Sequence, residues 1–392
     1  MSRRIFITVA EVSGDKHAAQ LIRSLRELDP QLTIEGHGGP EMAEAGARIH
    51  RNTVAKATMG WRGALLALDV YKLLRWTDRY FDEYQPDLQI GVDSPSMNFH
   101  FARLARRRGI PALQYVAPQL WAWAPWRMKK LRDCVDQVAC ILPFEESYFR
   151  AHGVNATFVG HPLFDELPEG RMRDRPGFSN GRPPVIGLLP GSRKTEAQHN
   201  FPPMLAVAER LRREFRGARF LVPTTDATHP IVRKLMAGQH GDIDVALDAF
   251  DQMVPRCDLC ITVSGTATLH VASFGVPMIV VYRVSPLTWH AGGRWLVKAR
   301  TFALVNLLAK QSTADAVAAA GGHIVPEYVP WIGSPDEVAE LAIRLLRNPD
   351  QLQAQRNQLE RLIRTLDHPG ASMRVARLAL EMIGSKPAKS IA

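Results

Sequence analysis

The sequence has few cysteines and no long apolar segment. Only 4 of its 392 residues are cysteine, which argues against a disulfide framework. Cys257 and Cys260 form a C-x-x-C pair, but Cys134 and Cys140 make no matching pair for a zinc site. Buried thiols along strands are therefore the expected arrangement. No segment reaches the roughly 18 uninterrupted apolar residues of a membrane span.

The N-terminus also lacks a complete secretion signal. Its apolar part runs from Ile5 to Ala10 and then meets Glu11, which is too short for a signal peptide. We therefore expect the protein to lie inside the cell. The sequence contains neither a Walker A pattern nor a G-x-G-x-x-G pattern, so it does not favour an ATPase or a dehydrogenase.

Positively charged residues outnumber negatively charged ones. The formal net charge is +10, with 46% hydrophobic and 22% charged residues, values typical of a folded globular protein with anionic partners. We recognise no nucleic-acid module and expect no nucleic acid partner. The D-x-D at 242–244 opens a strand, the wrong end for a ligand, so we expect no metal ion there. We expect no cofactor.

Short apolar, β-branched runs alternate with amphipathic segments along the whole chain. Continuous apolar runs are typical of parallel strands buried on both faces. We expect strands at 5–10, 32–39, 87–93, 112–118, 137–145, 156–162, 184–192, 219–224, 243–248, 259–265 and 278–283.

A segment rich in Pro, Gly and Arg interrupts this series between residues 165 and 184. We predict an N-terminal domain at 1–165, a linker at 166–184, a second domain at 185–368 and an amphipathic helix with a basic tail at 369–392. The fold class is α/β, with two facing, doubly wound, Rossmann-like domains and a cleft between them. Ligands of such sheets bind beyond the carboxyl ends of the strands.

Two strand ends in the second domain favour a phosphate ligand. In "LLPGSR", Gly191 lets the backbone approach closely, Ser192 offers a hydroxyl and Arg193 offers a forked cation. The turn at 264–266, Ser-Gly-Thr, precedes a helix whose first N–H groups suit a diphosphate. An ordinary strand-to-helix turn with a solvated Arg, and plain helix capping by Ser or Thr, are the alternatives.

Two carboxylates follow strands in the first domain. Asp93 comes directly after a buried strand, where it could take a proton from a hydroxyl nucleophile. Glu11 holds the same position after its own strand. An N-cap or Asx-turn is the alternative for Asp93.

Two stretches, 59–81 and 286–300, mix Trp with Arg and Lys. This pattern is typical of a membrane interface. A packed helix with solvated charges is the alternative.

Eight short motifs occur in order along the chain. They are "AEVSGD" (10–15), "GVDSPSMN" (91–98), "APQLWAWAPWR" (117–127), "LPFE" (142–145), "GHPL" (160–163), "LLPGSR" (188–193), "SGTATL" (264–269) and "VNLLA" (305–309). Taken together and in this order, they resemble the lipid-A-disaccharide synthase family. The resemblance implies an inverting, metal-independent glycosyltransferase of the GT-B fold. Its substrates would be UDP-2,3-diacylglucosamine and 2,3-diacylglucosamine 1-phosphate. Its products would be a β-1,6 disaccharide and UDP, formed at the inner face of the cytoplasmic membrane.

The resemblance also implies site residues. Asp93 and Glu11 are the catalytic candidates. The donor, UDP, would be bound by Gly191, Ser192, Arg193, Ser264, Gly265, Thr266, His270, Arg283 and Asn306. The acceptor lipid and an anionic membrane surface would meet Met59, Trp61, Arg62, Trp121, Trp123 and Arg127.

The chain departs from the usual family pattern at several positions. Ala10 stands in place of Gly, Ser96 in place of Asp, and His270 in place of Glu. An acidic residue usual near Gly63 is missing, and the segment after Asn306 also differs. A related GT-B transferase or UDP-sugar epimerase, and a noncatalytic UDP- or lipid-binding relative, therefore stand beside the synthase as alternatives.

Overall fold

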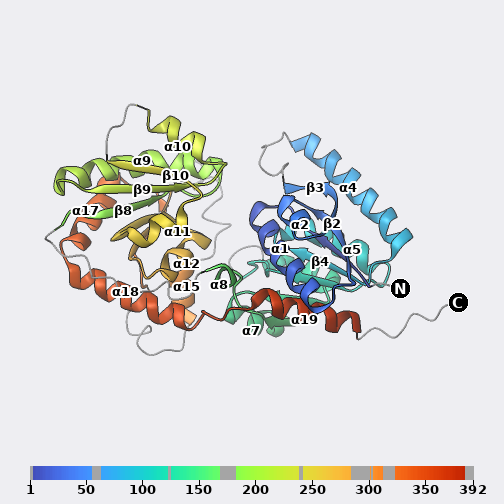
Figure 1. The fold of residues 1–392 in the computed structure, drawn as a ribbon. Helices are drawn as coiled ribbons and strands as arrows, with labels where there is room; N and C mark the ends of the chain where they lie inside the picture. The colour runs from blue at the N-terminus through green and yellow to red at the C-terminus, as the bar shows by residue number, and fades with distance from the viewer. Residues whose placement is uncertain are drawn as a thin grey trace. The chain divides into compact units, whose positions relative to one another are not determined.

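The computed structural model describes residues 3–54, 63–121, 125–167, 182–237, 242–283, 301, 303–311 and 323–384. The chain divides into two units. One comprises Met1–Glu166 together with Asp367–Ala392, and the other comprises Leu167–Leu366. Each unit is built on one parallel β-sheet covered by helices (Figure 1). No helix in the described part of the chain is both long enough and apolar enough to span a membrane.

The first unit has, within the described residues, a seven-stranded sheet in the order β3-β2-β1-β4-β5-β6-β7. The central strands β1 and β4 are mostly apolar and almost entirely buried, as expected for strands covered on both faces. The strands are β1 (Arg4–Thr8), β2 (Thr33–Gly38), β3 (Arg48–Asn52), β4 (Leu88–Val92), β5 (Ala112–Tyr115), β6 (Gln137–Cys140) and β7 (Ala156–Phe158).

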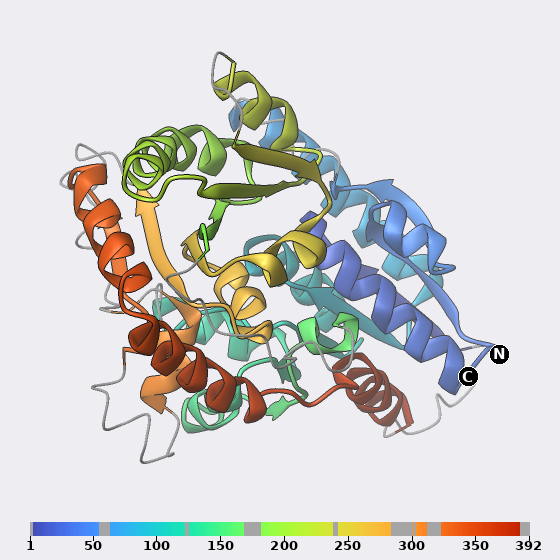
Figure 2. The same cartoon turned by 60° about the vertical axis from the view of Figure 1, so that its left-hand side comes forward.

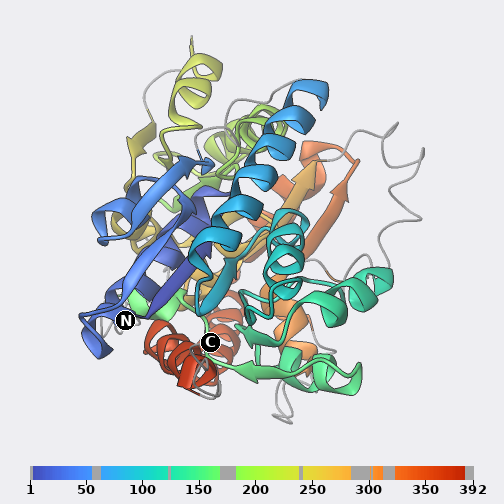
Figure 3. The same cartoon turned by 90° about the vertical axis from the view of Figure 1, so that its right-hand side faces the viewer.

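Successive side chains of β1 point to opposite faces of the sheet, so the apolar core of this unit has one part on each face. Ile5 and Ile7 pack with α1 (Val12–Leu28) and α19 (Ala371–Gly384), and these two helices run side by side (Figure 2). Phe6 points to the other face, which α4 (Gly63–Tyr84) and α5 (Pro95–Arg106) cover together (Figure 3). The remaining helices are α2 (Pro40–Glu44), η1 (Pro125–Arg127), α6 (Met128–Cys134), α7 (Pro143–Ala151) and α8 (Leu163–Glu166).

The second unit has, in its described part, a six-stranded sheet in the order β10-β9-β8-β11-β12-β13. Helices α9 and α17 pack together over one face and form its main core, while α12 packs with α15 and α18. The strands are β8 (Val185–Leu189), β9 (Arg219–Thr224), β10 (Ile243–Leu247), β11 (Leu259–Val263), β12 (Met278–Arg283) and β13 (Glu327–Trp331). The helices are α9 (Lys194–Glu214), α10 (His229–Leu235), α11 (Phe250–Met253), η2 (Val254–Arg256), α12 (Thr266–Ser273), α15 (Leu304–Gln311), α17 (Pro335–Leu346) and α18 (Pro349–Arg364).

Every strand predicted from the apolar runs is present, and the α/β prediction is confirmed. The apolar runs of the sequence do not predict β3 and β13. Both lie at the edge of the sheet that the described residues form. Their sequences, RIHRN and EYVPW, are charged or interrupted by Pro, as edge strands commonly are, so neither gives a continuous apolar run.

Candidate functional site

The candidate carboxylates of the first unit lie at the carboxyl ends of two neighbouring strands. Glu11 follows β1 and Asp93 follows β4, and these strands are parallel neighbours. The hydroxyl of Ser13 donates a hydrogen bond to Asp93 Oδ2 at 3.4 Å, so the first turn of α1, which follows β1, reaches the Asp93 carboxylate. The structure thus brings together the two segments that carry the predicted catalytic carboxylates.

Asp93 has an unusual backbone conformation. Its φ is 53° and that of Ser94 is 38°, both in the left-handed region that non-glycine residues rarely adopt. Asp93 Oδ1 accepts a hydrogen bond from the Ser94 N–H at 2.8 Å. The N-cap of α5 is Ser94, not Asp93. The Asp93 side chain is half-exposed, so the remaining oxygen positions of its carboxylate are accessible to a ligand.

Asp15, in the same motif as Glu11, has a different environment. Its carboxylate is buried and accepts hydrogen bonds from Gly39 N–H at 2.8 Å and Glu41 N–H at 3.1 Å. Burial raises the pKa of Asp15, although these backbone hydrogen bonds oppose the shift. Asp15 therefore fixes the start of α2 rather than facing a ligand.

Trp121 lies in the loop after β5, the strand next to β4. Its indole N–H donates to Glu145 Oε1 at 3.1 Å, and its ring meets Phe144 edge-on at 5.2 Å. Glu145 is buried and also accepts from the Leu142 N–H at the start of α7. Burial raises the pKa of Glu145 to about 7. Arg127, half-exposed, ends η1 just beyond this loop.

The two predicted phosphate turns of the second unit also lie side by side. They follow β8 and β11, which are parallel neighbours. Gly191 has a φ of 107°, and a Cβ there would lie 2.5 Å from Glu196 Oε2. The carboxylate of Glu196 accepts a hydrogen bond from the Arg193 N–H at 3.2 Å and lies 3.3 Å from Arg193 Nη1. Ser192 and Arg193 are exposed.

The second turn leads into α12. Its N-cap residue is Gly265, which has no side chain of its own to cap the helix. Gly265 and Thr266 are exposed, and Ser264 is half-exposed. The first N–H groups of α12 are therefore directed at the same edge as the Arg193 turn, which suits an anion.

Arg283 ends β12, the next strand in the sheet. Its backbone N–H donates to Asn200 Oδ1 at 2.6 Å, and its Nη1 donates to the Gly333 carbonyl at 3.0 Å. The guanidinium also lies over the Trp331 ring, 5.6 Å from its centroid. Arg283 thus joins the two turns at the carboxyl edge, in a position fixed by its own contacts.

His270 and Asn306 lie in different surroundings from the turns. The His270 ring stacks on Phe250 with centroids 4.3 Å apart, and its Nε2 lies 2.8 Å from Asp251 Oδ1. Asn306 is fully buried. Its amide donates to the Val325 carbonyl at 2.7 Å and accepts from the Val325 N–H at 2.9 Å. These hydrogen bonds of Asn306 therefore fix the position of the segment that leads into β13.

Several predicted residues lie outside the described part of the chain. These are Met59, Trp61, Arg62 and Trp123, together with the stretch 286–300. Within the described part of the 59–81 stretch, α4 exposes Leu68 and Tyr71 beside Lys72 and Arg75.

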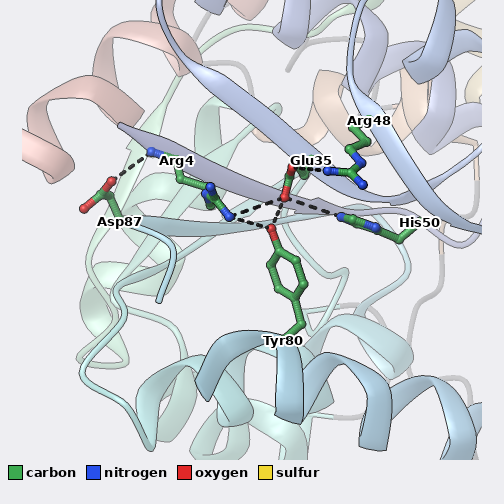
Figure 4. Close-up of polar contacts among 6 residues, drawn as sticks. All are labelled: Arg4, Glu35, Arg48, His50, Tyr80 and Asp87. Atoms are coloured by element: carbon green, nitrogen blue, oxygen red, sulfur yellow. Dashed lines mark hydrogen bonds and ion pairs between the residues drawn. The ribbon is translucent and has the colours of Figure 1, made fainter. Parts of the chain in front are cut away.

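A second polar cluster in the first unit lies away from the carboxyl edge. Glu35 in β2 is buried and forms ion pairs with Arg4 at 3.8 Å and Arg48 at 3.5 Å (Figure 4). Tyr80 of α4 donates a hydrogen bond to the same carboxylate, and His50 lies 3.4 Å from it. Arg4 and Arg48 begin their strands. The cluster therefore lies toward the amino ends of the strands, where it fastens α4 to the sheet.

Sequence reasoning missed the buried polar residues beneath the site. Thr8, Asn98 and Gln114 are at most 2% exposed, and they bond to one another or to the turn at Asp93. The available signal was polarity inside an apolar run, as for the Gln of "ALQY". The described residues contain no group of three or more His, Cys, Asp or Glu side chains placed to hold a metal ion.

Comparison with known proteins identifies the family. The family model for lipid-A-disaccharide synthetase matches residues 5–329. The chain belongs to this family. The family relative from Geobacter sulfurreducens is 36% identical over 390 residues, covering 98% of each chain. The relative from Nitrosococcus oceani is 32% identical over 384 residues, covering 97% of this chain and 96% of its own. The predicted resemblance and the hexosyltransferase class are confirmed.

Solved structures support the same fold at low sequence identity. A putative UDP-N-acetylglucosamine 2-epimerase from Listeria monocytogenes has a TM-score of 0.63 at 14% identity, covering 99% of this chain and 98% of its own. Acinetobacter baumannii MurG has a TM-score of 0.54 at 14% identity, covering 97% and 99%. Each unit carries one parallel sheet, as the two Rossmann-like domains of a GT-B fold do, and the predicted fold class is confirmed.

Proposed function

We propose that the enzyme transfers 2,3-diacylglucosamine from UDP to 2,3-diacylglucosamine 1-phosphate. The acceptor's 6-hydroxyl oxygen forms a bond to the sugar's anomeric carbon as the bond from that carbon to the diphosphate breaks. The electron pair of the broken bond leaves with UDP, and the hydroxyl proton goes to a carboxylate. The anomeric centre inverts, which gives the β-1,6 linkage. Family membership supports this reaction class.

Asp93 is the proposed general base, and its placement is the observation that carries the proposal. It is half-exposed at the carboxyl end of a central parallel strand, the usual ligand-binding edge of such sheets. A base there shortens the path of the proton from the hydroxyl nucleophile. Glu11, after the neighbouring strand, is the alternative base.

The donor diphosphate is proposed to bind the two turns after β8 and β11. The start of α12, whose N-cap residue is Gly265, supplies N–H groups and the positive end of a helix dipole. Arg193 supplies a full charge from the adjacent turn. These groups would stabilise the negative charge that develops on UDP as it departs. The proposed reaction therefore proceeds without a metal ion or another cofactor.

The acceptor is proposed to enter from an anionic membrane at the cytoplasmic face. Trp121 and Arg127 lie beyond β5, next to Asp93's strand, where they could meet the acceptor. The exposed Leu68, Tyr71 and Lys72 of α4 combine apolar and cationic groups, a combination suited to a lipid surface.

The test uses purified protein, UDP-2,3-diacylglucosamine and 2,3-diacylglucosamine 1-phosphate. Mass spectrometry should detect the disaccharide 1-phosphate and an equal amount of UDP, with or without EDTA. Replacing the acceptor by its deacylated form should abolish UDP release. Conversion of the UDP-sugar without any acceptor would instead indicate an epimerase. UDP-sugar binding without turnover would indicate a noncatalytic protein.

A further inference from the structure

Buried polar side chains form a connected network beneath Asp93. Gln89 Nε2 donates to Thr8 Oγ1 at 3.0 Å, and Thr8 Oγ1 donates to Asn98 Oδ1 at 2.8 Å. The Asn98 amide in turn donates to the Asp93 carbonyl at 2.6 Å. Gln114 Nε2 donates to the same carbonyl at 3.0 Å. These four side chains are at most 2% exposed. Buried polar groups are costly unless they are paired, so the network has a definite structural purpose.

The network ends on the strained part of the backbone. Asp93 and Ser94 are both left-handed, with φ of 53° and 38°, and non-glycine residues keep such conformations only where their surroundings enforce them. Asn98 also donates to the Val92 carbonyl at 3.1 Å. The amides of Asn98 and Gln114 therefore donate hydrogen bonds to the carbonyls of two consecutive residues, Val92 and Asp93. This turn sets the direction of the Asp93 side chain.

Gly91 shows how closely these amides approach β4. A Cβ at Gly91 would lie 2.8 Å from Asn98 Cβ and 3.0 Å from Gln114 Oε1. Those distances are shorter than ordinary van der Waals contacts, so any side chain at this position would displace one amide or both. The glycine inside this buried strand is thus explained by the two side chains that cover it.

We propose that Asn98 and Gln114 are positioning residues for Asp93. Their hydrogen bonds to the Asp93 carbonyl hold the strained turn, and the turn directs the carboxylate at the acceptor hydroxyl. Neither amide touches substrate. This inference rests on the proposed function, in which Asp93 is the base.

The chain offers a matched control in Gln89. This side chain is as buried as Asn98 and belongs to the same network, but its amide donates to Thr8 rather than to the turn. Gln89→Met, Gln114→Met and Asn98→Leu each replace a buried amide by an apolar group of similar size. A purely stabilising network would make all three variants alike in activity once their loss of stability is taken into account.

The experiment measures thermal midpoint, UDP affinity, kcat and KM for the parent and these three variants. A displaced base costs on the order of 10²-fold in rate when it moves by about 1 Å. We expect Asn98→Leu and Gln114→Met to lower kcat by about that factor with unchanged UDP affinity. Gln89→Met should keep the parental kcat despite a similar loss of thermal midpoint.

Asp93→Asn separates this inference from the proposed function. If Asp93→Asn keeps the parental kcat, the assignment of the base is wrong. If Asp93→Asn is inactive while Asn98→Leu and Gln114→Met turn over like Gln89→Met, the positioning role alone is overturned. Adding Gln114→Met to Asp93→Asn should cause no further loss of kcat, because no base remains to be positioned. Should Asn98→Leu fail to fold, Gln114→Met decides.

Discussion

Asp165 accepts a hydrogen bond from the backbone N–H of Gly370 at 2.7 Å, although 205 positions separate them in the sequence. The same carboxylate accepts from the N–H groups of Ala371 at 3.0 Å and Ser372 at 2.9 Å. One side chain thus satisfies three donors at the start of α19. The C-terminal segment is in this way joined to the first unit, where Val375 and its neighbours complete the core.

Asp165→Ala should destabilise the first unit, because it leaves these N–H groups without their charged acceptor. Loss of a buried or half-buried acceptor costs roughly 1–3 kcal/mol. The measurement is the free energy of unfolding by urea. Asp165→Asn, which keeps one acceptor oxygen, should lose less. Ser334→Ala removes a single exposed cap at α17 and serves as a control with a smaller effect. An Asp165→Ala variant as stable as the parent would contradict the prediction.

Glu145 should make stability depend on pH near neutrality. Its pKa is about 7 in the folded protein, because of burial, against about 4.5 for an ordinary Glu. Between these values the folded protein binds the proton more tightly than the unfolded chain does, so the free energy of unfolding falls as pH rises. The pKa difference corresponds to roughly 3 kcal/mol.

Glu145→Gln carries no titrating group at this position and is the reference. The free energy of unfolding of the parent minus that of the variant should fall between pH 4.5 and pH 8. Urea titrations of both proteins across this range provide the measurement. A difference that stays constant, or that grows with pH, would show that burial of Glu145 does not control its proton.

Most strands, and the turns that follow β8 and β11, could be predicted because their signals are local. The apolar run LCITV predicts a strand, and Ser264 and Gly265 directly after it predict where the strand ends. Asn98 and Gln114 could not be assigned in this way, because their partner is the Asp93 carbonyl and the pairing depends on which strands are neighbours. Glu35 likewise gains its role only when β3 and α4 pack beside β2 (Figure 4). The spacing of residues along one chain does not show which residues far apart in the sequence become neighbours in the fold.

Arg193→Ala should lower kcat more than it raises the KM for the donor, because a cation near the departing diphosphate acts mainly in the transition state. Removing one such group costs about 10²–10³-fold in kcat in other enzymes. Arg213→Ala is the matched control. Its side chain is 71% exposed, against 68% for Arg193, and each forms an ion pair with a Glu on the same helix, α9. Steady-state kinetics of both variants checks this. A change confined to KM would limit Arg193 to ground-state binding.

The exposed cations of α4 should contribute to membrane binding. Lys72, Arg75 and Arg79 are exposed, and each basic residue near an anionic surface is worth about 1 kcal/mol. Changing all three to Ser should weaken cosedimentation with vesicles containing anionic lipid, and added salt should do the same to the parent. A triple Ser variant at Arg213, Arg216 and Arg219, exposed residues of the other unit, removes the same charge elsewhere. Equal loss in both triple variants would show that only net charge matters.

His270 provides the sharpest test of the proposed donor site, because the resemblance to the family implies a Glu at this position, near the ribose of UDP. A Glu there would accept hydrogen bonds from both ribose hydroxyls, whereas neutral His has one acceptor nitrogen. In the structure, His270 has an acidic neighbour, because its Nε2 lies 2.8 Å from Asp251 Oδ1. A carboxylate at position 270 would be repelled by Asp251, which offsets the gain from a second ribose bond.

We therefore expect His270→Ala to weaken UDP binding by about 1 kcal/mol, the usual value of one net hydrogen bond. His270→Glu should bind UDP no better than the parent while Asp251 is present, and better once Asp251→Asn removes the repulsion. Calorimetric titration of UDP into the parent, the three single variants and the His270→Glu, Asp251→Asn double variant measures each term. Asp251→Asn alone isolates what Asp251 contributes through the imidazole.

If the Ala and Glu variants both bind UDP like the parent, residue 270 does not face the nucleoside. The stacking of its ring on Phe250 would then be its whole role, and the donor site would lie elsewhere on the edge formed by the turns at Arg193 and Gly265.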